Sequence, residues 1–149
     1  MTLALSGDEV AAKLEQQCPG SIIESSENSL LAKSEALLEL APFLKTTPDL
    51  DFDYLSSITA IDYYVYFELI YQLISLKYNH GLVLKTRCYD RDKPTTPSVV
   101  GLWRGADFQE REIYDLMGIS FDGHPNMKRI SLWDGFQGHP LRKDYVNDA

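Results

Sequence analysis

The sequence predicts an α+β fold in two layers, with a mixed or antiparallel β-sheet packed against helices and followed by an extended C-terminal segment. Three observations support this class. The centre of the chain has strand-like alternation, both flanks have the spacing of amphipathic helices, and the end is rich in glycine and proline without either period. We expect one domain, with an α+β core over residues 1–122 and an extended segment over 123–149.

Helical spacing and turn residues divide the first third of the chain into elements. Ser6 and Glu9 have the spacing of a capping box, in which a hydroxyl and a carboxylate satisfy backbone amides at the start of a helix. Pro42 lies too deep in the second periodic stretch for the first turn of a helix, so it should kink or split that helix. The expected elements are a helix over 7–17, hairpin strands over 21–24 and 30–32, a helix over 34–45, and a short helical or irregular piece over 50–55.

The middle of the chain predicts the sheet. Within 67–74 the odd-numbered residues are apolar and the even-numbered ones are mixed, as expected for a strand with one covered face and one partly exposed face. Asn79 and Gly81 both accept positive φ, so we expect a turn over 78–81 that includes His80. The expected strands cover 58–61, 67–76 and 82–87.

Two further helices are expected after the sheet. Thr96 as N-cap and Pro97 in the first helical position predict a short helix that runs into Trp103. Asp107 should cap a longer helix that ends at Leu116, with Gly118 as its left-handed C-terminal residue.

Composition and charge exclude several classes of function. The chain has 149 residues, 44% of them apolar, and no apolar run approaches the roughly 20 residues that cross a bilayer. Without a signal-peptide pattern at its start, we expect a cytoplasmic protein. The net charge is −8, and only residues 123–149 carry a small basic excess, which argues against a nucleic-acid module. Cys18 and Cys88 are expected to be free thiols.

The charged run of the longer helix invites a catalytic interpretation. Glu110 and Glu112 have the residue types of an acid/base pair, but residues two apart on a helix point in different directions and cannot meet at one substrate. Arg111 and Asp115 are four apart and are expected to pair on one face. We therefore expect a helix whose charges satisfy neighbouring loops or a partner.

Two Gly-His-Pro triplets form the second candidate. His124 and His139, with Asp134 or Asp144, could ligate a metal, but they lack the spacing of ligands on regular structure. Turn chemistry is the alternative, in which glycine opens the turn, proline stiffens it and the imidazole bonds a backbone group. No nucleotide, phosphate-loop or Cys-x-x-Cys motif is present in the sequence.

Several short motifs lie in the last third of the chain in a fixed order and spacing. They are Glu110-Arg111-Glu112, Asp115-Leu116-Met117-Gly118-Ile119, Phe121-Asp122-Gly123-His124-Pro125, Arg129-Ile130 and Gly138-His139-Pro140-Leu141-Arg142-Lys143-Asp144-Tyr145. Together they closely resemble the 30 kDa subunit family of the respiratory NADH–quinone oxidoreductase, complex I, which also occurs in the photosynthetic-type complex and in related membrane-bound hydrogenases. The resemblance covers roughly residues 50–145.

The resemblance implies a non-catalytic structural subunit in the hydrophilic arm of a proton-translocating enzyme. It implies docking on the quinone-site subunit and on neighbouring iron–sulfur subunits of complex I, on the cytoplasmic side of the cell membrane. NADH, FMN, the iron–sulfur clusters and the quinone would belong to partner subunits, so this chain is expected to hold no cofactor. The implied signature and partner-docking positions are Glu110, Arg111, Glu112, Asp115, His124, Arg129, His139, Arg142, Lys143, Asp144 and Tyr145.

Three alternatives stay open at this point. The chain could be the equivalent subunit of a membrane-bound hydrogenase or of a ferredoxin- or plastoquinone-linked complex. It could be an independent metalloenzyme that uses its histidines and nearby carboxylates, or an adaptor domain in an unrelated assembly.

Overall fold

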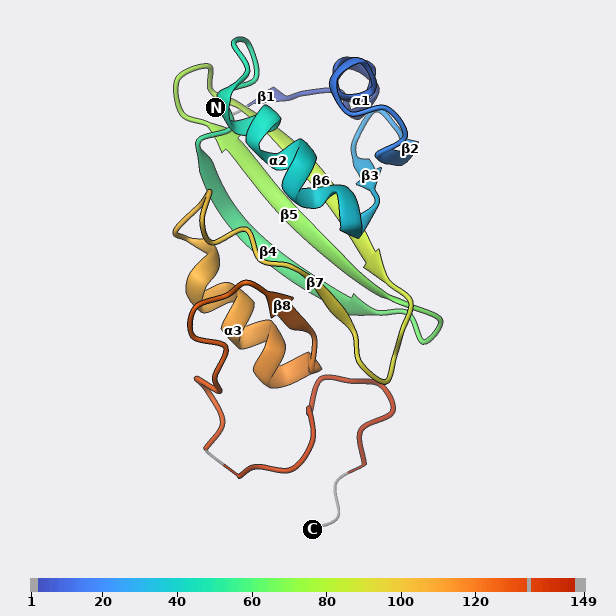
Figure 1. The fold of residues 1–149 in the computed structure, drawn as a ribbon, viewed down its shortest axis with the longest axis vertical. Helices are drawn as coiled ribbons and strands as arrows, with labels where there is room; N and C mark the ends of the chain where they lie inside the picture. The colour runs from blue at the N-terminus through green and yellow to red at the C-terminus, as the bar shows by residue number, and fades with distance from the viewer. Residues whose placement is uncertain (1–2, 134, 147–149) are drawn as a thin grey trace.

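A computed structural model describes residues 3–133 and 135–146, and it confirms the α+β class (Figure 1). The main sheet is mixed and has the order β2-β3-β6-β5-β4, with β1 and β3 running parallel to successive parts of β6. Its strands are β1 (Leu3–Ala4), β2 (Ile22–Ser25), β3 (Leu30–Ala32), β4 (Tyr54–Asp62), β5 (Phe67–Ser75) and β6 (His80–Cys88). The other elements are α1 (Gly7–Gln17), the 3₁₀ turn η1 (Ser34–Ala36), α2 (Leu37–Thr46), β7 (Thr95–Pro97), α3 (Ala106–Met117) and β8 (Ser120–Asp122).

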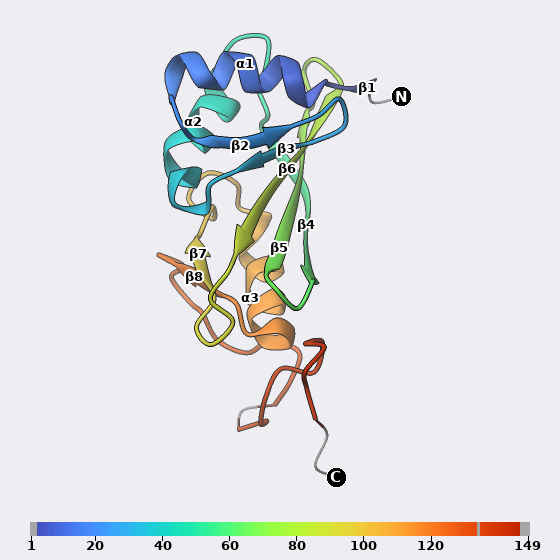
Figure 2. The same ribbon diagram turned by 90° about the vertical axis from the view of Figure 1, so that its right-hand side faces the viewer.

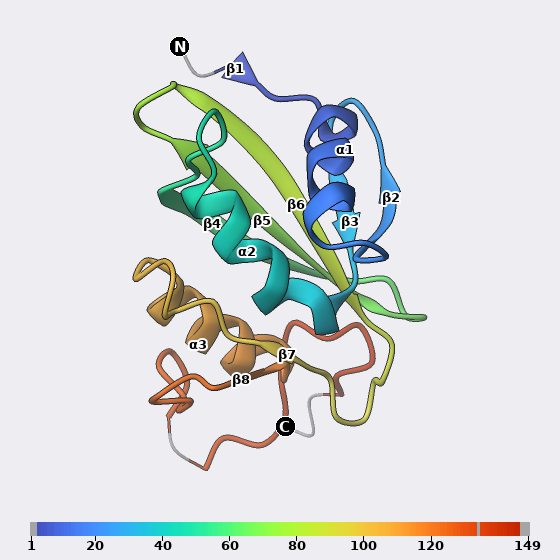
Figure 3. The ribbon, with the colours of Figure 1, turned by 45° about the horizontal axis from the view of Figure 1, so that its top comes forward.

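The core lies between the sheet and the helices. Helices α2 and α3 lie on the same face of the sheet, as two views show (Figures 1 and 3), and α1 packs on the β2–β3 hairpin (Figure 2). The expected alternation of β5 is confirmed, because its odd-numbered residues are buried, whereas Ile70 and Ile74 are half-buried and Gln72 is exposed. Burial of these apolar side chains is the main source of stability for the domain.

The centre of the sheet extends further than the sequence predicts. Strand β4 begins at Tyr54, in the piece expected to be helical or irregular, and runs to Asp62. A register shift between Leu55 and Ser57 inserts an extra residue, so the apolar period of this strand is broken where the prediction begins. The pattern over 58–61 is therefore only the regular half of a longer strand.

The prediction of a helix from Thr96 to Trp103 is wrong. Residues Thr95–Pro97 form β7, which runs parallel to β8 in a separate two-stranded sheet. Tight turns follow, in which the amides of Leu102 and Trp103 both donate to the carbonyl of Val99. A threonine before a proline favours extended backbone, which fits both the N-cap of a helix and a strand. Here the pairing with β8, which is distant in sequence, makes the segment a strand.

The prediction that His80 lies in the turn is wrong. The turn is completed by Asn79, which has the predicted positive φ of 53°, and His80 begins β6 with only 8% of its surface exposed. Its Nε2 lies 2.7 Å from the carbonyl oxygen of Leu50, and its ring lies 5.0 Å from that of Phe52. The imidazole therefore joins the sheet to the segment that precedes β4.

The helix ends differ from their predictions in detail. Helix α1 has the expected bounds, but the hydroxyl of Ser6 makes no capping hydrogen bond. Gly105, not Asp107, is the N-cap of α3, and Asp107 lies in the first turn, where a carboxylate is favoured by the helix dipole. Pro42 does not split α2, which continues to Thr46; the change of helix type occurs earlier, at Leu37.

Candidate functional site

Residues 123–133 and 135–146 wrap around α3 without forming a helix or a strand, and we call this segment the C-terminal clasp (Figure 1). Its path turns at Gly123, Gly135 and Gly138, whose φ angles of 85°, 89° and 86° suit glycine. With so few internal backbone bonds, the clasp must be held by contacts with the core. Three polar centres supply those contacts.

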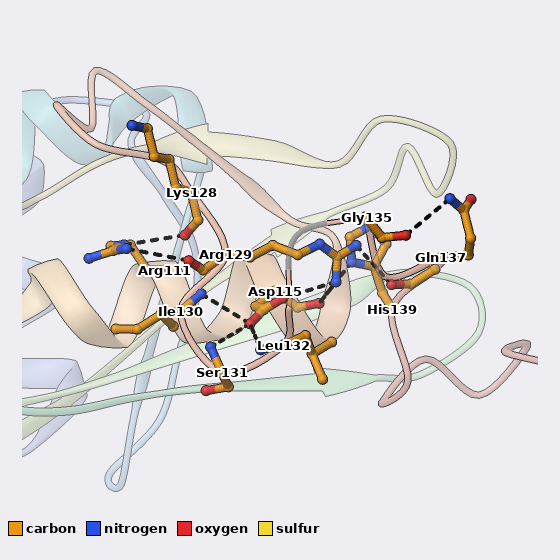
Figure 4. Close-up of polar contacts among 11 residues, drawn as sticks. Arg111, Asp115, Lys128, Arg129, Ile130, Ser131, Leu132, Gly135, Gln137 and His139 are labelled. Atoms are coloured by element: carbon orange, nitrogen blue, oxygen red, sulfur yellow. Dashed lines mark hydrogen bonds and ion pairs between the residues drawn. The ribbon is translucent and has the colours of Figure 1, made fainter.

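The first centre is the side chain of Asp115, which is fully buried beneath the clasp (Figure 4). Its Oδ2 accepts hydrogen bonds from the amides of Ile130, Ser131 and Leu132 at 3.2, 2.8 and 2.8 Å. Its Oδ1 accepts from Nη1 of Arg129 at 2.9 Å. A single helix carboxylate thus organises one whole turn of the clasp.

These contacts stabilise the ionised form of Asp115 and take the place of the expected pairing with Arg111. Burial alone raises its pKa, but the three amides and Arg129 outweigh burial, so the pKa lies below its ordinary value. The prediction that Arg111 pairs with Asp115 is wrong. Arg111 instead donates to the carbonyls of Lys128 and Arg129, at 3.2 and 3.4 Å.

The second centre is the C-terminal end of α3, where the last carbonyls of a helix lack partners within the helix. The clasp supplies three donors in succession. His139 Nδ1 lies 2.9 Å from the carbonyl of Asp115, the amide of Leu141 donates to Leu116 at 2.9 Å, and Arg142 Nε donates to Met117 at 2.6 Å. A guanidinium at this end also interacts favourably with the negative end of the helix dipole.

Gly118 makes this close approach possible. Its φ of 77° confirms the predicted left-handed position, and its amide donates to Tyr114. A Cβ at this position would lie 2.6 Å from Cδ2 of His139 and 2.8 Å from Nη2 of Arg142. Glycine is therefore required both for the turn and for the seating of the clasp.

The third centre joins the end of the clasp to the β4–β5 hairpin. Asp62 is buried, and both its oxygens accept from Arg91, at 2.6 and 3.0 Å. The amide of Lys143 donates to its Oδ2 at 2.9 Å, and Arg91 also lies 3.4 Å from Asp144. Arg91, aided by the Lys143 and Tyr64 amides, holds the pKa of Asp62 well below its ordinary value despite burial. We call Asp62 and Asp115 the two clasp carboxylates.

The two imidazoles serve different ends of α3 and do not meet at one site. Nε2 of His124 lies 3.0 Å from Oδ1 of Asp107, and its Nδ1 accepts from the amide of Asn126 at 2.9 Å. His139 bonds the opposite end of the helix, so the backbone bonding expected of the Gly-His-Pro turns is confirmed. No group of three or more metal-ligating side chains forms in the described part of the chain, and Asp134 lies outside it.

Glu110 faces the opposite side of α3, toward β7. Its carboxylate is fully buried, and it accepts from the hydroxyl of Ser98 at 2.5 Å and from the amide of Val99 at 3.0 Å. Burial raises its pKa, and these two hydrogen bonds partly offset that effect. Glu112 is exposed on another face, so the two glutamates do not converge. Glu110 anchors the turns that lead into α3.

The outer surface of the clasp carries large apolar side chains. Trp133 is 69% exposed and Leu141 is 59% exposed. Trp133 packs edge-on against Phe136, and the ring of Tyr145 packs on Gly138. The side chains of Arg129 and Arg142 thus bond α3, whereas those of Trp133 and Leu141 are largely exposed to solvent.

Sequence reasoning found most of these residues but missed Asp62 and Arg91. Asp62 interrupts an apolar run between Ile61 and Tyr63, and a lone carboxylate in such a run is the signal that could have found it. Arg91 lies in a charged loop, where nothing in the sequence distinguishes it from an ordinary surface residue.

The fold and the site together define the class: a small α+β domain whose inward-facing polar residues hold a C-terminal clasp against one helix. Two solved structures have this fold. A chain of the archaeal membrane-bound sulfane sulfur reductase matches with a TM-score of 0.72 and 25% identity, covering 94% of this chain and 85% of that one. The trypsin-resistant fragment (1–134) of Nqo5 matches with a TM-score of 0.61 and 30% identity, covering 78% and 98%.

Sequence comparison identifies the family. Residues 30–149 match the family described as respiratory-chain NADH dehydrogenase, 30 Kd subunit. An NADH-quinone oxidoreductase subunit of Roseiflexus sp. (strain RS-1) is 37% identical, over 95% of this chain and 85% of its own. The corresponding subunit of Rhizobium meliloti (strain 1021) is 44% identical over 74% of this chain, which spans only 62% of that relative. The chain therefore belongs to the 30 kDa subunit family of the respiratory-chain NADH dehydrogenase.

Proposed function

We propose that this chain is a non-catalytic structural subunit of the hydrophilic arm of a proton-translocating NADH–quinone oxidoreductase. It docks on the quinone-site subunit and on neighbouring iron–sulfur subunits, at the cytoplasmic side of the membrane. NADH, FMN, the clusters and the quinone are held by those partners. Its task is to keep adjacent subunits in register so that electrons pass from NADH to quinone.

The observation that carries this proposal is the division of the clasp into two faces. The signature residues Asp115, Arg129 and Arg142 bond the domain itself, so they build the shape of the surface. Large apolar side chains of the clasp, Trp133 and Leu141 among them, face solvent, and large aromatic and aliphatic residues of this kind anchor protein interfaces. A segment held firmly to the core, with apolar side chains on its outer face, is suited to association with a partner.

Membrane association would come through the assembly. Among the described residues, no helix has the length and hydropathy needed to cross a bilayer. The relatives that support this proposal are named as subunits of a quinone oxidoreductase. In that setting the domain would be peripheral and would follow its partners to the membrane.

A second candidate is the equivalent subunit of a related membrane-bound complex. The similarity to a chain of the sulfane sulfur reductase complex favours it, since that match covers nearly the whole chain. The two candidates differ in the partner subunits rather than in the fold. Mass spectrometry of the subunits that co-purify with this chain from native membranes separates them.

The docking face is tested by co-purification of the tagged full chain from membranes. Replacing Trp133 and Leu141 together by serine should reduce recovery of the quinone-site subunit by roughly tenfold, because central apolar anchors contribute most of the binding energy. The matched control is Leu76→Ser, an exposed leucine in the turn between β5 and β6, which should leave recovery unchanged. Unchanged recovery of the double variant would refute the docking role.

The basic end of the clasp gives an independent variant. Arg142→Ala with Lys143→Ala should also reduce recovery, because Arg142 seats the clasp on α3 and on the carbonyl of Arg91 at 3.1 Å. The isolated domain should stay folded by circular dichroism, since the core beneath is apolar and extensive. Full recovery with this variant would show that the seating of the clasp does not matter for assembly.

A further inference from the structure

A second surface lies beside the clasp, between β4 and α3. A groove of about 210 Å³ separates these elements. Drug-sized ligands generally occupy pockets of about 300–1,000 Å³, so this groove suits one or two aliphatic side chains better than a whole small molecule. Its apolar lining comes from Ile58 and Ala60 of β4, Ile113, Leu116 and Met117 of α3, and Leu141 of the clasp.

One wall of the groove is the free edge of the sheet. Strand β4 is the terminal strand of the order β2-β3-β6-β5-β4, so within residues 3–133 and 135–146 no strand pairs with its outer side. At Ile58 the amide donates to the side-chain oxygen of Gln109 at 2.7 Å, so an added strand would replace Gln109 as the acceptor of this one amide. Sheet edges of this kind accept an added strand.

The rim of the groove carries a negative charge. Glu112 lines the groove and is exposed, and it forms no ion pair within the described part of the chain. Arg111, its neighbour in sequence, is directed to the clasp instead. A ligand that lies in the groove would therefore place a cation beside Glu112, which is complementary to the net charge of −8 of this chain.

We propose that the groove receives an extended segment of another protein of the assembly, which adds to the outer edge of β4 as a further strand. The segment places an aliphatic side chain against Ile113 and Leu141 and a lysine or arginine beside Glu112. Main-chain bonds along the edge give affinity, and the apolar groove and the carboxylate select the sequence. This inference rests on the proposed function, because the segment belongs to a neighbouring subunit.

Hydrogen exchange measured by mass spectrometry tests the added strand. The full chain is compared alone and in the complex purified from membranes. Amides within residues 57–61 should exchange at least roughly tenfold more slowly in the complex, because strand addition protects amides that point away from β5. Glu112→Lys should reverse most of this protection, whereas Glu9→Lys, the same charge change on an exposed residue of α1, should not.

The outcomes separate this inference from the docking of the clasp. Protection of residues 128–145 without protection of 57–61 would overturn the added strand and leave the proposed function standing. Protection of neither segment would overturn both. Protection of 57–61 that appears in the isolated chain as its concentration rises would show that a second copy occupies the edge, and would also overturn the proposal. Unaltered protection in Glu112→Lys would overturn the pairing with a cation.

Discussion

Replacing Asp115 by asparagine is expected to open the clasp. The buried carboxylate accepts three amide hydrogen bonds and one from Arg129, and asparagine keeps the shape but loses the charge and one acceptor oxygen. Removal of one partner from a buried pair costs about 3–5 kcal/mol. Because Arg129 keeps some contact with water, we expect the lower end, about 3 kcal/mol, which corresponds to roughly a 100-fold larger opening constant.

The assay for this prediction reads the contact itself. Hydrogen exchange of the amides of residues 130–132, corrected for intrinsic rates, should accelerate by roughly 100-fold in Asp115→Asn, since these amides are donated to the carboxylate. Glu112→Gln, on the same helix, is the control and should leave the rates unchanged, because Glu112 is exposed. Rates within about threefold of the unmodified chain would refute the claim that Asp115 organises the clasp.

Three further predictions follow from the structure. Gly118→Ala should destabilise the domain in urea unfolding by roughly 2 kcal/mol more than Gly123→Ala. Both glycines have positive φ, but only a Cβ at Gly118 would collide with side chains of the clasp. Equal losses of unfolding free energy in the two variants would contradict this packing. The stabilisation of the clasp by the two clasp carboxylates should be complete above pH about 4 and decline as the pH falls below it, because their pKa values in the folded chain lie below those in the unfolded chain. Protection of the amides of residues 130–132 from hydrogen exchange that stays constant down to acid pH would contradict this. Burial raises the pKa of the Cys88 thiol to about 11. At mildly alkaline pH Cys88 should therefore react with a thiol reagent roughly 100-fold more slowly than an ordinary thiol. A reaction rate equal to that of the same cysteine in the unfolded chain would contradict this.

Local patterns predicted the elements whose structure is decided locally. The β5–β6 hairpin and the bounds of α1 follow from apolar periodicity and turn residues, which act within a few positions of each other. Helix α3 was predicted for the same reason, with Gly118 as its left-handed end. The free thiols were also predicted correctly, as Cys18 and Cys88 form no disulfide within the described residues.

Predictions failed where a distant segment decided between two local possibilities. Thr96 and Pro97 fit a helix start, but pairing with β8 makes them a strand. Arg111 and Asp115 fit a helical ion pair, but three amides from the clasp and Arg129 bind that carboxylate instead. The third centre of the site forms around Asp62. Its partners Arg91 and Lys143 are 29 and 81 positions away in the sequence, beyond the reach of any local pattern.

The central claim, that the apolar face of the clasp docks on a neighbouring subunit, is tested most directly at Trp133. Hydroxyl-radical footprinting of the full chain, alone and in the complex purified from membranes, measures the exposure of this side chain. It is 69% exposed in the isolated structure, and we predict that its oxidation rate falls by roughly fivefold or more in the complex, while buried Trp103 gives the baseline. An oxidation rate of Trp133 that is the same in both states would contradict the account.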